Sequence, residues 1–311
     1  MTKSLEKTLT KIPVVAVLAF ICCAFWGSAF PCIKIGYELF NVSSGDIPTQ
    51  ILFAGCRFTL AGVMAIVMCS AGAKKFLCPS NMEEVGMTLK LCMFQTVLQY
   101  IFFYIGLAHA DGSKSAIIEG SNVFVSILVA ALVFRIEKLT ARKLIGCLIG
   151  FAGVVIINLS GGAMSLDMSI LGEGFVFIST FAYAASSVIM KGYSSRTNPV
   201  MLSGWQFFVG GLILIAAGLI FGGKLTVLTP AGAAMLLYLA FISAAAYSLW
   251  AVLLKYNPVS RVTVFGFMNP VCGVLLSAWW LGESSAALGL RSAAALVLVC
   301  AGIYVVNSQK S

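Results

Sequence analysis

The sequence predicts an all-α polytopic membrane protein with ten transmembrane helices. Its composition is the first reason, because 60% of the 311 residues are hydrophobic and only 10% are charged, with a mean hydropathy of +1.01. Soluble domains contain about 25% charged residues. So few charges cannot cover a soluble protein of this size, so the apolar surface must face lipid. In lipid, only helices and closed barrels satisfy their backbone polar groups.

The length of the apolar runs favours helices over a barrel. The runs are continuous and about twenty residues long, which is what a helix needs to cross a bilayer of about 30 Å. Barrel strands would alternate apolar and polar residues over about ten positions. The first run is too long for the core of a signal peptide, so we expect it to remain as the first helix. The ten predicted spans are 13–37, 51–71, 88–108, 115–135, 141–159, 171–191, 201–221, 231–255, 261–281 and 289–306.

The distribution of lysine and arginine supports the count of ten and gives an orientation. Ten spans place fourteen basic residues on the side of the N-terminus: Lys3, Lys7, Lys11, Lys74, Lys75, Arg135, Lys138, Arg142, Lys143, Lys191, Arg196, Lys255, Arg261 and Lys310. The other side receives three, which are Lys114, Lys224 and Arg291. Basic loops stay in the cytoplasm. We therefore predict both termini in the cytoplasm of a multi-pass cell-membrane protein, and the net charge of +9 needs no nucleic acid partner.

The two halves of the chain resemble each other. Residues 26–34 align with 183–191, and Arg57-Phe58 aligns with Gln206-Phe207. A single offset of 146 relates 104–137 to the second half. Because five helices is an odd number, the second half enters the membrane upside down. The sequence thus predicts two inverted repeats, 13–159 and 171–306, an arrangement typical of transporters that work by alternating access.

Several short motifs carry a family resemblance. They are Phe25-Trp26-Gly27, Arg57-Phe58, the segment 133–140 followed by Gly146, Gly150 and Gly153, then Asn269-Pro270 and Leu281-Gly282-Glu283. With these motifs the chain resembles the EamA-type transporters of the drug/metabolite transporter superfamily. The resemblance implies ten helices around a central cavity, with the fifth and tenth at the periphery. It also implies export or exchange of amino acids or related metabolites. The first half has Phe124 where the second has Pro270, so an identical kink in the two halves is not expected.

Polar and aromatic residues inside the apolar spans are the candidates for binding a solute, because each is costly in lipid. An aromatic cavity with a few amides and hydroxyls suits a small amphipathic solute. The alternative is that such residues join helices by hydrogen bonds. The candidate substrate-binding residues are Trp26, Gln95, Gln99, Tyr104, Glu119, Asn122, Tyr183, Tyr247, Trp250 and Asn269.

Glu119 is the acid placed well inside a predicted span, and three interpretations of it remain open. In the first, Glu119 pairs with Arg57 or Lys34, which lie at similar depth, and holds helices together. In the second, it faces the cavity, where burial favours its protonated form, and exchanges a proton or a cationic substrate. In the third, a basic residue binds a substrate carboxylate while Glu119 binds the ammonium group. The last two interpretations are compatible with one site.

Small residues and cysteines give no further chemistry. The ten cysteines contain no C-x-x-C pair and lie mostly in apolar runs, so we expect neither a metal site nor a disulfide framework. Gly146, Gly150 and Gly153 form a small-residue face suited to close helix packing, either within the chain or in a homodimer.

These observations favour a secondary transporter that needs no cofactor, since no ATP-binding motif is visible. The expected function is export or exchange of small amphipathic metabolites such as amino acids. The alternative is a proton-coupled exporter of small organic cations or drugs that uses Glu119. A membrane-embedded enzyme is a remote alternative, because it would require a nucleophile with a base or clustered metal ligands.

Overall fold

The computed structural model describes residues 3–43, 45–110, 112–158, 169–227, 229–281 and 290–308. Over these residues the chain is helical, and nine helices are long and apolar enough to cross a membrane. Ser292–Asn307 forms a further, shorter apolar helix. The prediction of an all-α multi-pass fold is confirmed, while the cytoplasmic placement of the termini stays a prediction. Residue 159, Gly282 and Glu283 lie outside the described residues.

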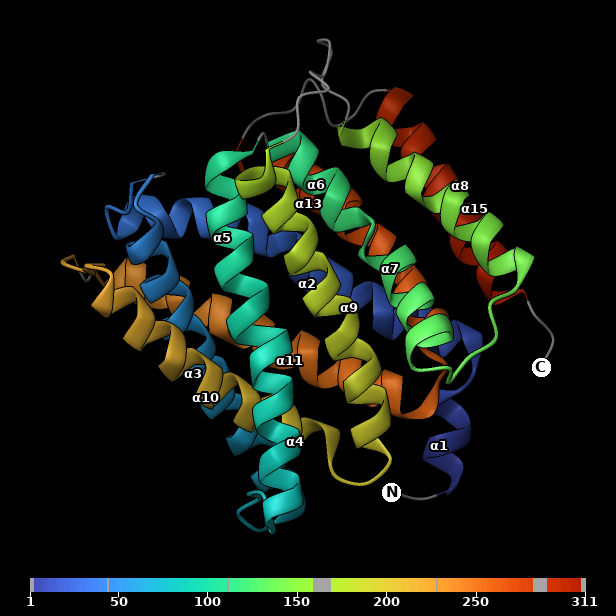
Figure 1. The fold of residues 1–311 in the computed structure, drawn as a ribbon, viewed down its shortest axis with the longest axis horizontal. Helices are drawn as coiled ribbons and strands as arrows, with labels where there is room; N and C mark the ends of the chain where they lie inside the picture. Colours follow the sequence, from blue (N-terminus) through green and yellow to red (C-terminus); the bar gives the residue numbers. More distant parts are fainter. Residues whose placement is uncertain are drawn as a thin grey trace.

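The helices are gathered into one bundle (Figure 1). The first half contains α1 (Lys3–Leu9), α2 (Ile12–Leu39), α3 (Ile47–Ala73), α4 (Met82–Cys92), the π-helical turn η1 (Met93–Leu98), α5 (Gln99–His109), α6 (Gly112–Gly120), α7 (Asn122–Leu128), the π-helical turn η2 (Val129–Val133) and α8 (Ala141–Asn158). The second half contains the π-helical turn η3 (Ile170–Gly174), α9 (Phe175–Ser194), α10 (Pro199–Ile220), α11 (Pro230–Tyr256), α12 (Val259–Thr263), the 3₁₀ turn η4 (Val264–Phe267), α13 (Met268–Leu281) and α15 (Leu290–Asn307).

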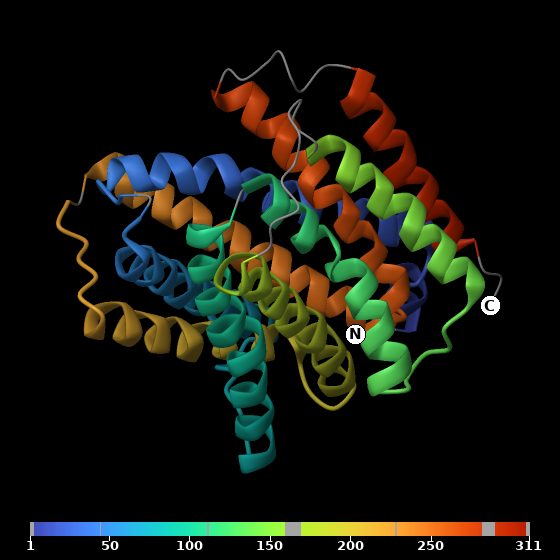
Figure 2. The same cartoon turned by 45° about the horizontal axis from the view of Figure 1, so that its top comes forward.

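The observed helices agree with the predicted spans to within a few residues, apart from two additions. The short helix α1 was not predicted, and α4 begins six residues before the predicted span. Figure 2 shows α4 extending away from the rest of the bundle. This extension contains Glu83 and Glu84, and Asn81 caps it by accepting a hydrogen bond from the Glu84 backbone N–H at 2.8 Å.

Local sequence explains where several long helices begin. Asp46 accepts from the N–H of Thr49 at the start of α3. Asn198 accepts from two N–H groups of α10, and Thr229 accepts from the Gly232 N–H of α11. A proline stands at the first or second position of each helix, where its missing N–H costs nothing.

Glycines allow two close helix pairs, each with one member from each half. In Figure 1, α3 lies beside α10, and α8 lies beside α15. A Cβ added to Gly55 of α3 would lie 2.6 Å from the backbone nitrogen of Ile215 on α10. A Cβ added to Gly302 of α15 would lie 2.6 Å from the carbonyl oxygen of Gly146 on α8. The glycine face predicted on the fifth helix therefore packs within the chain, against α15.

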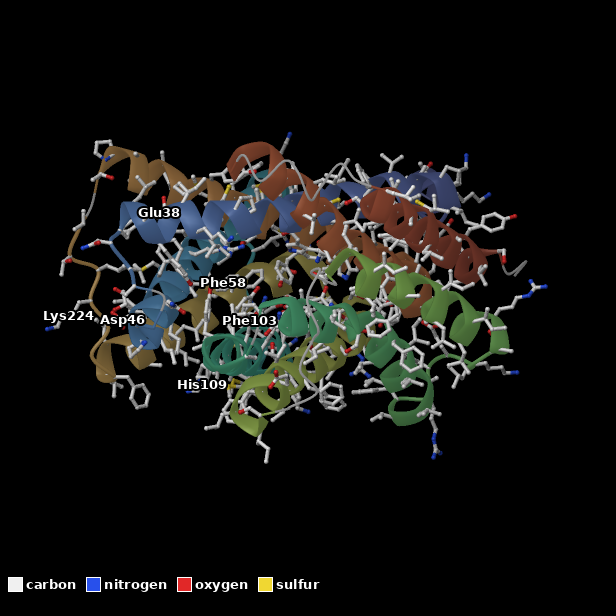
Figure 3. All side chains as sticks on the ribbon, turned by 90° about the horizontal axis from the view of Figure 1, so that it is seen from above. Glu38, Asp46, Phe58, Phe103, His109 and Lys224 are labelled. Atoms are coloured by element: carbon white, nitrogen blue, oxygen red, sulfur yellow. The ribbon has the colours of Figure 1, made fainter. Side chains whose placement is uncertain are left out.

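Aromatic side chains fill the centre of the bundle. Figure 3 shows Phe58 and Phe103 among the helices, whereas Asp46 and Lys224 lie together at one end. The ring of Phe58 stacks on that of Phe207, with centroids 5.1 Å apart and planes inclined by 12°. Phe58 and Phe207 are the residues that the alignment of the two halves makes equivalent.

Candidate substrate-binding cavity

A cavity of about 410 Å³ lies between the two halves of the chain. Its volume is in the usual range for a small-molecule site. It is lined by Trp26, Ala29, Ile33, Lys34, Arg57, Gln99, Tyr100, Phe103, Tyr104, Ala116, Glu119, Gly120, Asn122, Asn158, Ser179, Thr180, Tyr183, Tyr247, Gly266, Asn269, Pro270, Gly273 and Val274. The lining combines an aromatic wall with a small number of charged and amide groups.

Two interrupted helices border the cavity. In the first half the helix breaks at Ser121, between α6 and α7, where the Ser121 N–H bonds to the carbonyls of both Ile117 and Ile118. In the second half, η4 separates α12 from α13 just before Pro270. Gly120 and Gly266, one from each break, both line the cavity, and they are 146 positions apart. Both halves therefore break at the same place, although only the second has a proline there.

The aromatic wall is fixed by ring contacts and one hydroxyl pair. The ring of Trp26 meets Tyr247 edge-on at 5.0 Å, and Trp250 lies behind it at the same distance. The hydroxyls of Tyr100 and Tyr247 are 3.0 Å apart and hydrogen-bonded. The indole nitrogen of Trp26 is buried and has no hydrogen-bond partner among the described residues. An N–H in this position is available to a ligand.

Arg57 brings a buried positive charge to the cavity, since its side chain is only 4% exposed. Its Nε donates to Ser243 Oγ at 3.0 Å and to the Leu239 carbonyl at 3.3 Å. The ring of Phe58 lies 5.2 Å below the guanidinium carbon. Neither Nη atom makes a hydrogen bond to a residue that the structure describes. The Nε side of the guanidinium is thus bonded to α11, and the Nη side has no hydrogen-bond partner among the described residues.

Glu119 is half-buried and lines the same cavity. Within the described part of the chain it forms no ion pair, so neither Arg57 nor Lys34 neutralises it. Lys34 is exposed and also borders the cavity. A positive and a negative group therefore face one chamber without bonding to each other. Two amide oxygens, Gln99 Oε1 and Asn269 Oδ1, are likewise buried there and have no partner among the described residues.

Comparison with known proteins identifies the fold. The sequence profile of the EamA-like transporter family matches residues 14–159 and 170–308. The chain belongs to this family. It is 28% identical over 287 residues to a transporter of Archaeoglobus fulgidus, covering 91% of this chain and 94% of the relative. It is 26% identical over 299 residues to the "Probable amino-acid metabolite efflux pump" of Salmonella typhimurium, covering 93% of each.

Two further matches extend over most of the chain. The inner membrane transporter YedA of Escherichia coli is 29% identical over 304 residues, which is 90% of this chain and 88% of YedA. A crystal structure at 17% identity superimposes with a TM-score of 0.76, covering 94% of this chain and 96% of the other. At that identity the superposition establishes the common fold. The protein is therefore an EamA-family transporter and a multi-pass membrane protein.

Most of the residues singled out from the sequence of this EamA transporter border the cavity, and two do not. Those at the cavity are Trp26, Gln99, Tyr104, Glu119, Asn122, Tyr183, Tyr247, Asn269, Arg57 and Lys34. Trp250 packs behind Trp26 and does not line it. Gln95 accepts a hydrogen bond from Gln206 Nε2 at 3.1 Å, and so joins the third predicted helix to α10.

A π-helical turn explains why Gln95 and Gln99 separate. In a regular α-helix, residues four apart share a face. The turn η1 (Met93–Leu98) uses i→i+5 bonding, which adds a residue and rotates the helix beyond it. Gln95 therefore faces α10 while Gln99 faces the cavity. Tyr100 and Phe103 also border the cavity and were not among the predicted residues.

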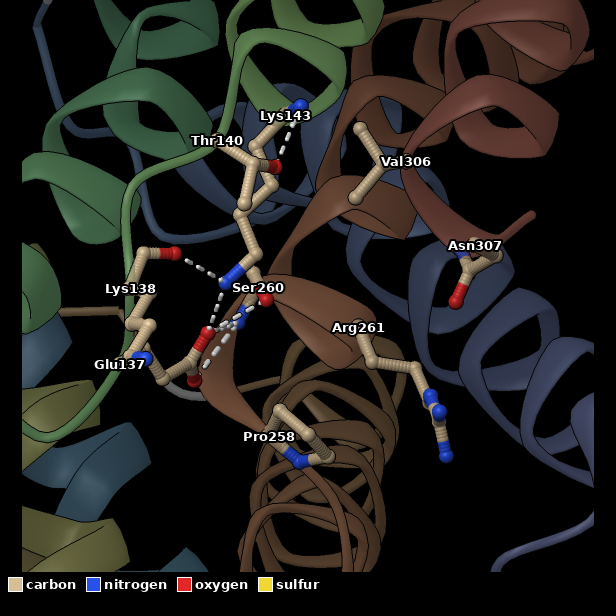
Figure 4. A pocket seen from close by; sticks show the side chains of 9 residues that line it. All are labelled: Glu137, Lys138, Thr140, Lys143, Pro258, Ser260, Arg261, Val306 and Asn307. Carbon is tan, nitrogen blue, oxygen red and sulfur yellow. Dashed lines mark hydrogen bonds and ion pairs between the residues drawn. The ribbon is translucent and has the colours of Figure 1, made fainter. Parts of the chain in front are cut away.

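A second, smaller cavity of about 290 Å³, drawn in Figure 4, lies toward the end of α8 that is opposite to Asn158. Its main feature is Glu137, in the loop after η2, which bonds across to the second half of the EamA chain. The carboxylate accepts hydrogen bonds from Lys143 Nζ at 2.8 Å and from both the N–H and the hydroxyl of Ser260. We call this set of three residues the Glu137 clasp. Lys143 lies in the first turn of α8, and Asn158, the last residue of α8, borders the large cavity, so the two sites are about 22 Å apart along that helix.

The clasp also sets the protonation of its carboxyl group. Burial alone would raise the pKa of Glu137, but the hydrogen bonds from Lys143 and Ser260 and the charge of Lys143 outweigh it. The pKa of Glu137 therefore lies below its ordinary value of 4.5. The carboxylate stays ionised at neutral pH and keeps the loop joined to α12.

Proposed function

We propose that this EamA-family transporter exports or exchanges small zwitterionic metabolites of the amino-acid type by alternating access. The observation that carries the proposal is the pair Arg57 and Glu119, which face one aromatic cavity without bonding to each other. A buried charge without a partner is costly. A zwitterion would satisfy both at once, with its carboxylate at Arg57 and its ammonium at Glu119. The aromatic wall would hold its apolar side chain.

The position of the cavity supports an outward-facing state. The part of α2 that lines the cavity, from Trp26 to Lys34, lies toward the C-terminal end of that helix. Asn158, which also lines the cavity, is the last residue of α8. The Glu137 clasp lies at the opposite end, where the predicted cytoplasmic loops gather. With the predicted orientation, the cavity would open outward and the clasp would close the cytoplasmic side. Release of the clasp would then accompany the change to the inward-facing state.

The inverted-repeat part of the proposal rests on three observations. The family profile matches the chain twice, at 14–159 and 170–308. The helix breaks beside Gly120 and Gly266 are equivalent positions of the two halves. The equivalent rings of Phe58 and Phe207 stack on each other, as residues beside a two-fold axis would. Broken helices that meet near the middle of the membrane are where secondary transporters bind their solutes.

One alternative has its own support. Glu119 is a half-buried carboxyl group without a counter-ion among the described residues, which also suits proton-coupled export of small organic cations or drugs. In that case a proton and a cation would compete for Glu119, and Arg57 would have no part in binding.

Counterflow in liposomes tests the proposal. Purified protein is reconstituted, and uptake of labelled phenylalanine, phenethylamine and 3-phenylpropionate is compared; these share a ring but carry both charges, the cation alone and the anion alone. We expect phenylalanine to move best, and we expect Glu119→Gln and Arg57→Gln each to reduce its uptake at least about tenfold, because each removes one charged contact. Glu38→Gln is the matched control, since Glu38 is exposed on α2 and does not line the cavity (Figure 3).

The same panel separates the alternatives. Movement of phenethylamine alone, driven by a proton gradient and lost in Glu119→Gln but not in Arg57→Gln, would favour the cation exporter. If wild-type protein moves phenylalanine and both variants retain its rate, the charged pair does not bind the solute and the proposal fails.

A further inference from the structure

We infer that Ser243 is a positioning residue that aims the guanidinium of Arg57 at a substrate carboxylate, and so makes the transporter selective for carboxylated solutes. Ser243 is fully buried on α11 and does not itself line the cavity. It acts through Arg57, which does. The inference rests on the proposed function, because it names the residue that prepares one half of the zwitterion site.

Two hydrogen bonds fix the orientation of the Ser243 hydroxyl. Its O–H donates to the Leu239 carbonyl, one turn earlier on α11, at 2.8 Å. Because the proton is committed there, an oxygen lone pair remains to accept from Arg57 Nε at 3.0 Å. The Leu239 carbonyl accepts from the same Nε at 3.3 Å. Together, hydroxyl and carbonyl fix the Nε edge of the guanidinium to α11.

The face of the guanidinium is fixed as well. The ring of Phe58 lies 5.2 Å from its central carbon, and Phe58 is itself held by stacking on Phe207. With one edge and one face occupied, the two Nη atoms form the edge that is left for the cavity. This edge matches the two oxygens of a carboxylate in an end-on, bidentate pair.

Burial makes this arrangement selective. Arg57 always carries its charge, and no described residue supplies a counter-ion. A carboxylate in the cavity would neutralise that charge, whereas an amine lacking the carboxylate would leave it buried and unpaired. Sites of this kind discriminate strongly against analogues that lack the matching polar group. Loss of the Ser243 oxygen would let the guanidinium turn and weaken the bidentate fit.

The test compares three variants on the same helix. Ser243→Ala removes the oxygen, Ser243→Thr retains a hydroxyl, and Ser248→Ala is the matched control, because Ser248 is a buried serine of α11 whose hydroxyl has no partner among the described residues. Concentrations for half-maximal counterflow are measured for phenylalanine and phenethylamine, and the melting temperature of each purified variant is recorded.

We expect Ser243→Ala to raise the half-saturating concentration of phenylalanine about tenfold, the loss expected for one hydrogen bond to a charged group, and to leave that of phenethylamine within twofold. Ser243→Thr should restore the phenylalanine value, and Ser248→Ala should match wild type for both solutes. A purely structural role would shift both solutes equally and lower the melting temperature in proportion.

Failure of the inference is distinguishable from failure of the proposed function. If wild-type protein prefers phenylalanine and Arg57→Gln abolishes the preference, but Ser243→Ala keeps it, Ser243 does not position Arg57. If wild-type protein shows no preference for the carboxylated solute, the proposed function fails first. If Ser243→Ala does not fold, Ser243→Thr and Ser243→Cys decide the matter, because the weakly accepting sulfur should raise the phenylalanine value while the threonine hydroxyl should not.

Discussion

Replacement of Glu137 by glutamine should open the clasp at the end of the bundle opposite the large cavity. The carboxylate accepts three hydrogen bonds, from Lys143 Nζ and from the N–H and hydroxyl of Ser260. The side chains of Lys143 and Glu137 are only 9% and 11% exposed, so water screens the pair weakly. Glutamine keeps one acceptor oxygen but loses the charge.

The size of the effect can be worked out from the bonds that are lost. A hydrogen bond to a charged group contributes about 1.5–3 kcal/mol. Taking about 2 kcal/mol for the weakened attachment of Ser260, opening of the clasp becomes about thirtyfold more frequent, since 1.4 kcal/mol is a factor of ten. The N–H of Ser260 bonds to Glu137 at 3.2 Å, so its exchange with solvent deuterium reports this opening.

Hydrogen exchange with mass spectrometry is the assay. Peptides that contain Ser260 should exchange about thirtyfold faster in Glu137→Gln than in wild type, while peptides from the middle of α11 remain unchanged. Glu83→Gln is the matched control, because Glu83 forms an exposed pair with Arg196 at 3.1 Å, with side chains about two-thirds exposed. Unchanged exchange at Ser260 in Glu137→Gln would refute the claim that Glu137 holds the two halves together there.

Acid should act in the same direction as the substitution. Because the folded-state pKa of Glu137 lies below 4.5, its ionised form stabilises the clasp above that pH. The stabilisation is lost as the pH falls below 4.5 through the lowered value. Wild-type protein should therefore lose more thermal stability between pH 5 and pH 3 than Glu137→Gln, which has already lost this contribution. Equal losses would contradict the assignment.

Three further predictions concern packing, binding and topology. Gly302→Ala should lower unfolding stability by about 1–3 kcal/mol in thermal or chemical denaturation, because the new Cβ would lie 2.6 Å from the Gly146 carbonyl; Gly192→Ala, which meets nothing within 4 Å, should not. Gln95→Leu should lower stability by about 1–3 kcal/mol by leaving the Gln206 amide short of a partner, yet leave the half-saturating concentration of the solute unchanged. Cys78 is exposed in the loop before α4, and an impermeant maleimide should label it in right-side-out vesicles only after permeabilisation; labelling of intact vesicles would overturn the predicted orientation.

Because the protein lies in a membrane, the positions of its helices can be predicted from the sequence. A bilayer imposes length and hydropathy on every span, so the helices could be predicted to within a few residues. It does not specify which face of a helix meets which neighbour. Gln95 and Trp250 show the difference, since both were placed on the correct helix but face a packing partner. The π-helical turn that separates Gln95 from Gln99 has no propensity signature. It accompanies the close approach of Thr96 to Gly210 of α10, a tertiary contact.

The two halves contribute different kinds of residue to the cavity. The charged groups Arg57, Glu119 and Lys34 all belong to the first half. At the offsets of the repeat, Gln206 is equivalent to Arg57 and Phe265 to Glu119, and both are neutral. The equivalent of Lys34 is Lys191, which is charged but does not line the cavity.

The second half contributes instead the hydroxyl of Tyr247, the amide of Asn269, and the hydroxyl oxygen of Ser243, which accepts a hydrogen bond from Arg57 Nε. α3, which carries Arg57, lies along α10 of the other half, so rocking of the halves against each other would act directly on the contacts around Arg57. The hydrogen bond between Arg57 and Ser243 joins the two halves, so such a motion would weaken or strengthen it. Selectivity for a carboxylate would then differ between the proposed outward-facing and inward-facing states.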